Sequence, residues 1–378
     1  MDPRNARSTR PKVAEPIARV VIDLTIVDPP AIKATGVGRY ALEIAQALVA
    51  ARPSWRFVVL GRRADVPGAQ AERPAWPTER AAVRVAWLHV RGPAHARRAG
   101  AAVWFSPAPL IPAWWRGAAV ATFHDLVFVR RPELYRGRLH ALHAGWAARR
   151  AATRAQAIVC VSGATARAVI DGLGSDPSRV TVIPNGVSDV FRRAAAGASR
   201  GRHLLFVGTF EARKGLDTLA AALPALRAAG VDAPLLLAGR PGWGAREALE
   251  RLARDPSVEI RHGPDDRALA ALYDEAIAVL YPSVLEGFGL PVAEAMAAGR
   301  PVVASDLEAI REWAGDVPWY VEPGDPGQLA RTIAALVNAP DEAARRVTEG
   351  MAVAAGLRWS IAGERTAEII ERIARDRP

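Results

Sequence analysis

The sequence predicts a two-domain α/β protein in which each domain is a doubly wound parallel sheet with helices on both faces. Three observations support this prediction. The chain has 378 residues, which is more than one ordinary hydrophobic core accommodates. Short runs rich in Val, Ile and Leu alternate with amphipathic runs rich in Ala, Leu and Arg along the chain. The alternation stops once, in the turn-rich segment 181–202, and then resumes.

The first domain is expected to span residues 18–195. It follows a polar, proline-interrupted stretch, 1–17, which has no apolar core like that of a signal peptide and is expected to be a disordered tail. Helical runs at 39–50 and 164–173 lie between or after apolar runs that predict strands covered on both faces. The predicted strands of this domain are 19–27, 56–61, 81–90, 101–107, 119–124 and 157–162.

The second domain is expected to span residues 196–358 and to repeat the same alternation. The last run of the chain, 360–375, predicts an amphipathic helix with Ile361, Ile369, Ile370 and Ile373 on its apolar face, and we assign 359–378 to this terminal helix. The predicted strands of the second domain are 203–210, 233–240, 258–263, 277–283, 301–306 and 319–323.

The composition limits the classes of partner. The net charge is +11, but only three of the 50 basic residues are lysine and the arginines are spread along the chain. Such diffuse charge, without a recognisable nucleic-acid-binding module, predicts a solvated surface and no nucleic-acid partner. The single cysteine, Cys160, excludes an internal disulfide and indicates a reducing cytoplasm. No apolar run of the sequence approaches the ~20 residues that cross a bilayer.

The segment VGTFEARKGLDTL (207–219) predicts a strand, a short loop and a helix that begins near Gly215. Arg213 and Lys214 stand at that helix start, where free N–H groups and the helix dipole attract anions. A lysine is informative in a chain that otherwise uses arginine, because its ammonium group is a compact point charge. The two cations predict a phosphate or pyrophosphate site, although the spacing is not that of a P-loop.

The segment PSVLEGFGLPVAEAMAAGRPVVAS (282–305) sets Glu286 and Glu294 on either side of a glycine-rich bend. Glu286 follows a predicted strand, and Glu294 lies in the first turns of a helix predicted to start at Pro291. Around Gly289 the backbone N–H groups can approach ligand oxygens directly. Each carboxylate can accept hydrogen bonds from paired hydroxyls, so the pair suits a sugar joined to a ribose through a pyrophosphate.

These motifs resemble the retaining nucleotide-sugar glycosyltransferases of family 4, the glycosyl transferases group 1. The resemblance rests on Arg-Lys-Gly at 213–215, the Glu-x7-Glu spacing with its FGLP, the tail AGRPVVAS and the stretch EWAGDVPWYVEPGD at 312–325. It extends through essentially the whole second half. It implies the GT-B fold, in which two Rossmann-like domains face each other across a cleft and the C-terminal helix crosses back to the first domain. The first domain would bind the acceptor and the second the nucleotide sugar.

The resemblance also implies roles for individual residues. Arg213 and Lys214 would hold the donor diphosphate and stabilise the leaving group. Glu286 would bind the donor sugar and Glu294 the ribose hydroxyls. The other donor-site residues of the second domain would be Gly208 beside the pyrophosphate, His262 in the base-cradling stretch RHGPDD (261–266), and the backbone donors of Phe288, Gly289 and Leu290.

Two motifs of the first half are interpreted through the same resemblance. Gly36 and Gly38, in ATGVGRY (34–40), would face the donor pyrophosphate across the cleft. A plain helix-capping turn stays open as the alternative. A dinucleotide-binding fingerprint does not fit, because its glycines follow a strand directly, whereas DPPAIKAT intervenes here. His124 follows a predicted strand and is expected to contact the donor sugar; whether it transfers a proton stays open. Asp125 is expected to orient His124 or to cap the next turn.

Trp114 and Trp115 lie beside Arg116 in the segment LIPAWWRGAA (110–119). Three interpretations stay open for them: core packing, a platform for the acceptor, or an interfacial anchor on an anionic membrane.

The sequence thus predicts a retaining, metal-independent hexosyltransferase of the cytoplasm, with peripheral binding to the inner face of the membrane if the tryptophans are an anchor. The first choice of donor is GDP-mannose, and a UDP-sugar is the alternative; neither a cofactor nor a metal is expected. The acceptor would be a glycan or polyprenyl-linked glycan in surface polysaccharide or glycolipid synthesis. The competing hypotheses are a phosphorylase or nucleotide-sugar epimerase of the same fold, and an inactive GT-B scaffold.

Overall fold

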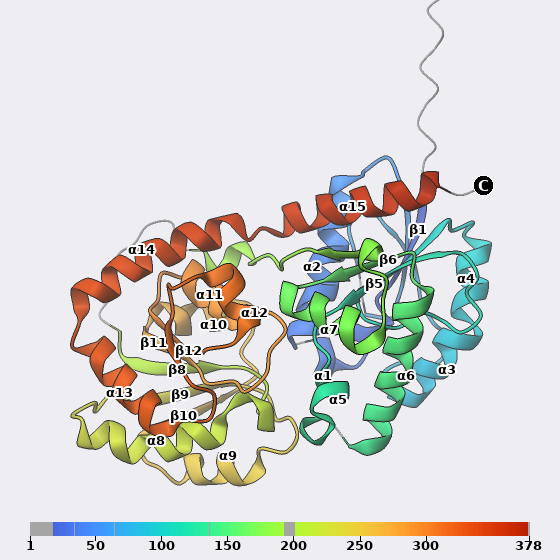
Figure 1. Cartoon of the computed structure of the whole chain (residues 1–378). Helices are drawn as coiled ribbons and strands as arrows, with labels where there is room; N and C mark the ends of the chain where they lie inside the picture. The colour runs from blue at the N-terminus through green and yellow to red at the C-terminus, as the bar shows by residue number, and fades with distance from the viewer. Residues whose placement is uncertain (1–17, 34, 64, 136, 193–200, 377–378) are drawn as a thin grey trace, which may run out of the picture.

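The computed structural model describes residues 18–376 except 34, 64, 136 and 193–200, and shows two parallel sheets in separate domains (Figure 1). The first sheet has the order β3-β2-β1-β4-β5-β6-β7. Its strands are β1 (Arg19–Asp23), β2 (Arg56–Leu60), β3 (Gln70–Glu72), β4 (Val103–Ser106), β5 (Ala118–Phe123), β6 (Ala157–Cys160) and β7 (Val180–Val182). The tail predicted at 1–17 and the domain boundary predicted at 195 lie outside the described residues.

The second sheet has the order β10-β9-β8-β11-β12-β13, which is the Rossmann order 3-2-1-4-5-6. Every strand pairing in both sheets is parallel. The strands are β8 (His203–Val207), β9 (Leu235–Gly239), β10 (Val258–His262), β11 (Ala276–Tyr281), β12 (Val302–Ser305) and β13 (Trp319–Val321). The predicted fold class of two doubly wound parallel sheets is therefore confirmed.

Helices cover both faces of each sheet, because strands that are apolar on both faces require a cover on each. The first domain contains α1 (Pro30–Lys33), α2 (Gly36–Ala51), α3 (Ala81–Val90), α4 (Gly92–Arg98), α5 (Val127–Arg130), α6 (Arg138–Arg154) and α7 (Gly163–Leu173). The second contains α8 (Leu216–Ala228), α9 (Arg246–Ala253), α10 (Asp266–Asp274), α11 (Leu290–Ala297), α12 (Glu308–Ala314), α13 (Pro326–Val337) and α14 (Pro340–Gly356).

One predicted strand is wrong. Residues 81–90 form helix α3, although Val83, Val85 and Trp87 alternate as in a strand. Only Trp87 and Leu88 are buried in this helix. Consecutive residues of a strand point to opposite faces, whereas consecutive residues of a helix lie about 100° apart and can share one buried face. The short edge strands β3 and β7 were not predicted, because each has only three residues and neither is fully buried.

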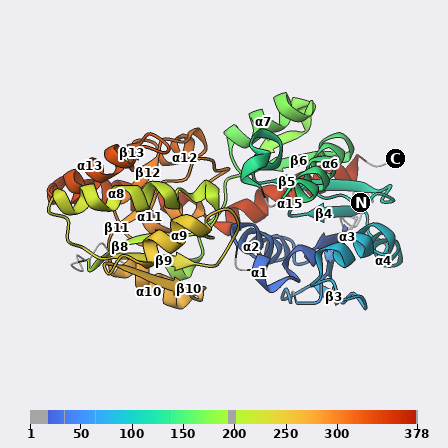
Figure 2. The same ribbon diagram turned by 90° about the horizontal axis from the view of Figure 1, so that it is seen from below.

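The C-terminal helix α15 (Trp359–Arg375) crosses from the second domain to the first and lies along α2, as predicted (Figures 1 and 2). Its buried face includes Ile369, Ile370 and Ile373. Ile361 was predicted on this face but is 47% exposed, because it lies about 180° around the helix from the buried Ile370.

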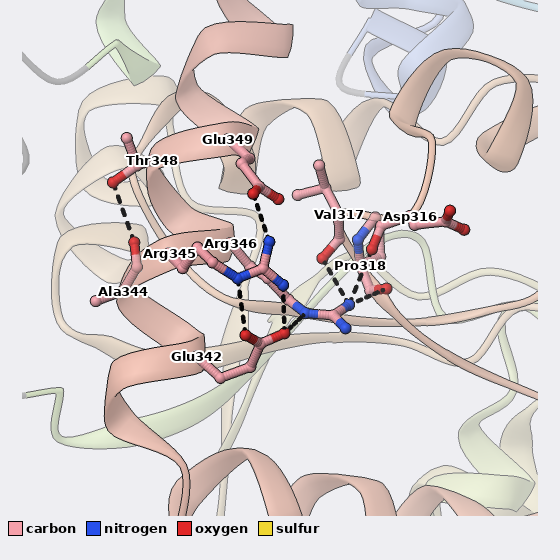
Figure 3. Close-up of polar contacts among 9 residues, drawn as sticks. All are labelled: Asp316, Val317, Pro318, Glu342, Ala344, Arg345, Arg346, Thr348 and Glu349. Carbon is pink, nitrogen blue, oxygen red and sulfur yellow. Dashed lines mark hydrogen bonds and ion pairs between the residues drawn. The ribbon is translucent and has the colours of Figure 1, made fainter.

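Helix α14 stays on the second domain, where Arg346 attaches it to the segment before β13 (Figure 3). Arg346 donates to the backbone carbonyls of residues 316–318 and lies 4.5 Å over the ring of Trp319. Glu342 accepts hydrogen bonds from both Arg345 and Arg346. The end of α14 is therefore held in place on the second domain, and the chain crosses to the first domain from there.

The chain crosses between the domains twice, and the two crossings are bonded to each other. The N–H of Val187, in the first crossing, donates to the carbonyl oxygen of Leu357, in the second, at 2.9 Å. The guanidinium of Arg192 donates to the carbonyls of Ala354 and Leu357. The two connections thus form one joint rather than two independent linkers.

Candidate functional site

The topology of the second sheet places the predicted cations and Glu286 together. In a doubly wound sheet the ligand site lies beyond the carboxyl ends of the strands where the order reverses, which here is between β8 and β11. Arg213 and Lys214 lie in the loop after β8, and Glu286 lies in the loop after β11. Residues 72 positions apart therefore meet at one sheet edge.

The three side chains form a compact ion cluster. Lys214 Nζ donates to Glu286 Oε1 at 2.6 Å, and Arg213 Nη1 lies 3.0 Å from Glu286 Oε2. Lys214 Nζ also donates to the hydroxyl of Tyr281 at 3.1 Å, and Arg213 Nε lies 3.0 Å from Glu211 Oε2. All these charged side chains are nearly buried. The cluster thus sets two cations against two carboxylates in a largely dry environment.

Burial and mutual attraction oppose each other in this cluster. Burial alone would raise the pKa of Glu286, but attraction by Arg213 and Lys214 outweighs it and lowers the pKa to about 2. Burial, together with repulsion from Arg213, lowers the pKa of Lys214 in spite of Glu286. Glu286 is therefore ionised near neutral pH. A further anion beside Lys214 would offset the repulsion between Lys214 and Arg213.

The first domain closes directly onto this cluster at Gly287. A Cβ atom at this position would lie 1.5 Å from the carbonyl oxygen of His124, so only glycine permits the approach. The hydroxyl of Thr165 donates to the carbonyl oxygen of His124 at 3.2 Å and lies 3.4 Å from that of Gly287. The end of β5 and the bend after β11 are thus in backbone contact.

His124 is held as a neutral ring beside this contact. Its Nε2 donates to the carbonyl oxygen of Pro107 at 2.8 Å, and its ring meets that of Tyr40 edge-on at 4.6 Å. Burial lowers its pKa, with only partial opposition from the hydrogen bond to Pro107 and from Asp125. Asp125 accepts the N–H of Val127 and so caps the next turn, one of the two roles expected for it.

Two helix N-termini face each other across the domain interface. Gly36 begins α2 in the first domain, and a Cβ there would lie 3.6 Å from Cδ1 of Leu290, which begins α11 in the second. Gly289 caps α11 with a φ of +89°, a conformation that favours glycine. The N–H of Gly38 is already used, because it donates to the capping hydroxyl of Thr35 at 3.2 Å. The paired helix starts make this part of the interface attractive to anions.

Glu294 lies on α11, away from the ion cluster, and has different partners. Its Oε2 accepts a hydrogen bond from the hydroxyl of Tyr273 at 2.9 Å, and its Oε1 lies 3.5 Å from Nε of Arg39 in the first domain. Burial raises the pKa of Glu294, and attraction by Arg39 opposes the rise. The two glutamates of the motif are therefore held by separate sets of charges.

The other predicted residues are less closely grouped. Gly208 follows β8, where a Cβ would lie 3.9 Å from the side chain of Lys214. Phe288 stacks on Trp313 at 5.0 Å and its carbonyl oxygen accepts a hydrogen bond from Trp313 Nε1, so its ring is part of the packing. His262 is exposed at the end of β10, 6.1 Å edge-on from Phe210, and is not part of the ion cluster. Among the described residues, no group of three His, Cys, Asp or Glu side chains is arranged to hold a metal ion.

Two family profiles match nearly the whole of the two domains. Residues 34–190 match Glycosyltransferase Family 4, and residues 201–339 match Glycosyl transferases group 1. The chain belongs to glycosyltransferase family 4. The resemblance deduced from the motifs of the second half therefore extends to the first half of the chain.

Named relatives agree with this family 4 assignment. The chain is 35% identical over 226 residues to a phosphatidyl-myo-inositol mannosyltransferase of Mycobacterium leprae, covering 57% of this chain and 59% of the relative. It is 27% identical over 264 residues to an MMP alpha-(1->4)-mannosyltransferase of Mycolicibacterium hassiacum, covering 68% of this chain and 60% of the relative. The alignments thus span about three fifths of the length of these curated relatives.

A solved structure supplies the fold of the family 4 chain. Anabaena Alr3699/HepE in complex with UDP and glucose superposes with a TM-score of 0.72 at 18% identity, over 94% of this chain and 99% of that one. The two Rossmann-like domains and the returning helix α15 form the GT-B fold, as the resemblance implied.

Some partners at the site were not predicted for this family 4 chain. Glu211 lies two residues before Arg213 in the same quoted run, so proximity in sequence was an available signal. Tyr273 and Tyr281 lie in buried elements, where a tyrosine is indistinguishable from ordinary core packing. Arg39 lies inside the quoted ATGVGRY, but its partners come from the other domain and leave no local pattern.

Proposed function

We propose that this chain is a retaining hexosyltransferase that moves a sugar, first choice mannose, from a nucleoside diphosphate donor to a glycan or lipid-linked acceptor. The observation that supports it best is the buried cluster of Arg213, Lys214 and Glu286 at the switch point of the second sheet. In this proposal the second domain binds the donor and the first domain binds the acceptor.

The proposed step needs charge stabilisation more than a strong base. The bond between the sugar's anomeric carbon and the β-phosphate oxygen breaks, and a bond from the same carbon to an acceptor hydroxyl forms on the same face. The hydroxyl's proton passes to the departing diphosphate. Arg213 and Lys214 stabilise the negative charge that develops on this leaving group, while Glu286 orients the sugar hydroxyls. His124, kept neutral by burial, is assigned to sugar contact rather than to proton transfer.

GDP-mannose is the first choice of donor. Both relatives named above are mannosyltransferases by name, which supports mannose. A UDP-sugar is the alternative, since the Anabaena protein of the same fold was solved with UDP and glucose.

A thermal-shift panel tests the proposed function. GDP, UDP, ADP and dTDP, each alone and as a nucleotide sugar, are incubated with the full chain. One nucleoside diphosphate is expected to raise the melting temperature by several degrees, because binding at ~100 times Kd adds about 2.7 kcal/mol. A preference for GDP and GDP-mannose supports the first choice, and a preference for UDP or a UDP-sugar supports the alternative. A panel without any shift contradicts the donor site and favours the scaffold hypothesis.

Product analysis separates transfer from the other reactions of this fold. Incubation with the preferred donor and a membrane or glycan fraction is expected to release the nucleoside diphosphate and to form a new glycosidic bond that keeps the donor's anomeric configuration. Conversion of the donor to an epimeric sugar, or phosphorolysis of a glycan without nucleotide release, would overturn the assignment.

We further propose that the first domain binds an anionic membrane surface on the cytoplasmic side through one face, here called the Trp114 face. Trp114, Leu142 and Trp146 are 60%, 70% and 47% exposed. His89 links them, since it accepts the N–H of Ala113 and its ring lies 5.6 Å from that of Trp146. Trp115, by contrast, is buried against Trp104 and belongs to the core.

The chain segments that contribute this face contain no acidic residue. The sequence contains no Asp or Glu from residue 80 to 124 or from 134 to 170, and Arg116 and Arg149 are exposed beside the tryptophans. Exposed tryptophans with surrounding arginines suit the interface of an anionic bilayer. None of the described helices is long and apolar enough to cross a membrane.

Vesicle flotation tests the Trp114 face. The chain is expected to float with vesicles containing anionic lipid and not with neutral ones. The double variant Trp114→Ser with Trp146→Ser is expected to lower binding about 10-fold or more, because each tryptophan contributes an apolar anchor of over 1 kcal/mol. Ile361→Ser, an equally exposed apolar residue on α15, is the control and is expected to bind like the wild type. Equal flotation of all three proteins would refute the proposal.

A further inference from the structure

Arg39 occupies a position that its own helix disfavours. It is the fourth residue of α2, and a cation in the first turn of a helix meets the positive end of the helix dipole. Its side chain is nevertheless only 19% exposed. The guanidinium extends toward the other domain, whose acidic side chains offset its unfavourable interaction with the helix dipole.

Two carboxylates of the second domain receive this guanidinium. Nη2 of Arg39 donates to Oδ1 of Asp266 at 2.6 Å, and Nε lies 3.5 Å from Oε1 of Glu294. The guanidinium also lies 4.9 Å over the ring of Phe191, at the domain crossing. Asp266 is 55% exposed and Glu294 only 5%, so the charge on Glu294 depends on Arg39 far more than that on Asp266 does.

The other groups that face Glu294 do not supply a positive charge. Tyr273, on α10, donates a hydrogen bond to Oε2. Asp266 on α10 and Glu43 on α2 are acidic, and both raise the pKa of Glu294 further. Nη1 of Arg39 is buried and has no acceptor among the described residues, so one donor beside Glu294 is available to an oxygen of a ligand.

We propose that Arg39 is a positioning residue of the donor site, which reaches from the first domain to hold Glu294 oriented and negatively charged for the ribose hydroxyls of the nucleotide. This inference rests on the proposed function, which assigns Glu294 to the ribose. It adds that the ribose is recognised fully only when the domains are closed, because the supporting cation belongs to the opposite domain.

Ribose discrimination in a matched pair of variants tests the inference. Calorimetry compares GDP with 2′,3′-dideoxy-GDP, and UDP with 2′,3′-dideoxy-UDP, on the wild type, Arg39→Met and Arg52→Met. Arg52 is the control, because it directly follows the last residue of the same helix, is 21% exposed, pairs with Glu364 and Glu371, and lies over an aromatic ring. Its partners belong to α15 rather than to the donor site.

For the wild type and Arg52→Met, the better-binding ribonucleotide is expected to bind about 10- to 100-fold more tightly than its dideoxy analogue. Hydrogen bonds from the ribose hydroxyls to a charged group supply a difference of this size. Arg39→Met is expected to lose most of this preference at pH 7 and to recover part of it at pH 9. The reason is that Arg39 lowers the pKa of Glu294, so its removal shifts the ionisation of this buried carboxyl to higher pH. Using the ratio between the two nucleotides cancels the titration of the phosphate itself.

Each other outcome has a definite meaning. An Arg39→Met variant that keeps the wild-type ribose preference at pH 7 overturns this inference and leaves the proposed function intact. A preference that is lost equally at pH 7 and pH 9 also overturns it, because a purely structural role does not depend on ionisation of Glu294. A wild type that binds none of the four nucleotides overturns the proposed function and this inference with it.

Discussion

Replacing Lys214 with alanine is expected to lower the turnover of the donor by about 100- to 1,000-fold, the loss found when one preorganised charge-stabilising donor is removed. Lys214 Nζ lies 2.6 Å from Glu286, and burial beside Arg213 lowers its pKa, so it is fixed where an anion is most strongly attracted. Release of the nucleoside diphosphate, measured with saturating donor, gives the rate. The effect is expected in kcat more than in KM, because charge grows on the leaving group only as the bond breaks.

The fold is expected to tolerate this substitution. Glu286 keeps its contact with Arg213 at 3.0 Å, so no buried carboxylate is left without a cation. The melting temperature should fall by only a few degrees. Arg246→Ala, which removes a 90% exposed cation from the same domain, is the control and should turn over normally. Turnover in Lys214→Ala within a few-fold of the wild type would refute the assignment of the leaving-group site.

Replacing Gly287 with alanine is expected to lower turnover about 100-fold, because a displacement near 1 Å at a reacting centre has an effect of this size. The added Cβ would lie 1.5 Å from the carbonyl oxygen of His124, so either the bend after β11 or the whole first domain must move away. Either movement separates the ion cluster from the opposing domain. Initial rates and small-angle scattering on the same sample measure the loss and the accompanying expansion.

Gly172→Ala is the matched control for this glycine. It lies within helix α7 of the first domain, and a Cβ there meets nothing within 4 Å. Alanine in a helix is about 1 kcal/mol more favourable than glycine, so the control should be slightly more stable and fully active. A Gly287→Ala variant with normal rates would show that the observed closure is not needed for turnover.

The sequence predicted those features that depend on local pattern. Buried parallel strands have continuous apolar runs, so most strand positions followed from composition alone. The sequence also placed Arg213, Lys214 and Glu286 in loops after predicted strands, but their direct contact was not predicted, because it depends on β8 and β11 being neighbours in the sheet. The prediction of a strand at 81–90 was wrong, because alternating Val and Trp residues also occur on a helix with a narrow buried face.

The contacts between the domains could not be predicted in the same way. Arg39 and Glu294 are 255 positions apart in the sequence, and nothing in the pattern around either residue indicates the other as its partner. The need for glycine at 287 arises from a carbonyl of the opposite domain rather than from its own turn. Both depend on how the two domains dock, and periodicity within one domain contains no information about that docking.

The bond between Val187 and Leu357 limits how the two halves of the molecule can separate. Two free tethers would let the domains slide or twist apart in any direction, but tethers fastened to each other act as a single hinge. We expect any opening of the domains to be a rotation about this joint, with the largest displacement at the far rim. On the proposed function, substrates and products would then pass on the side away from the joint.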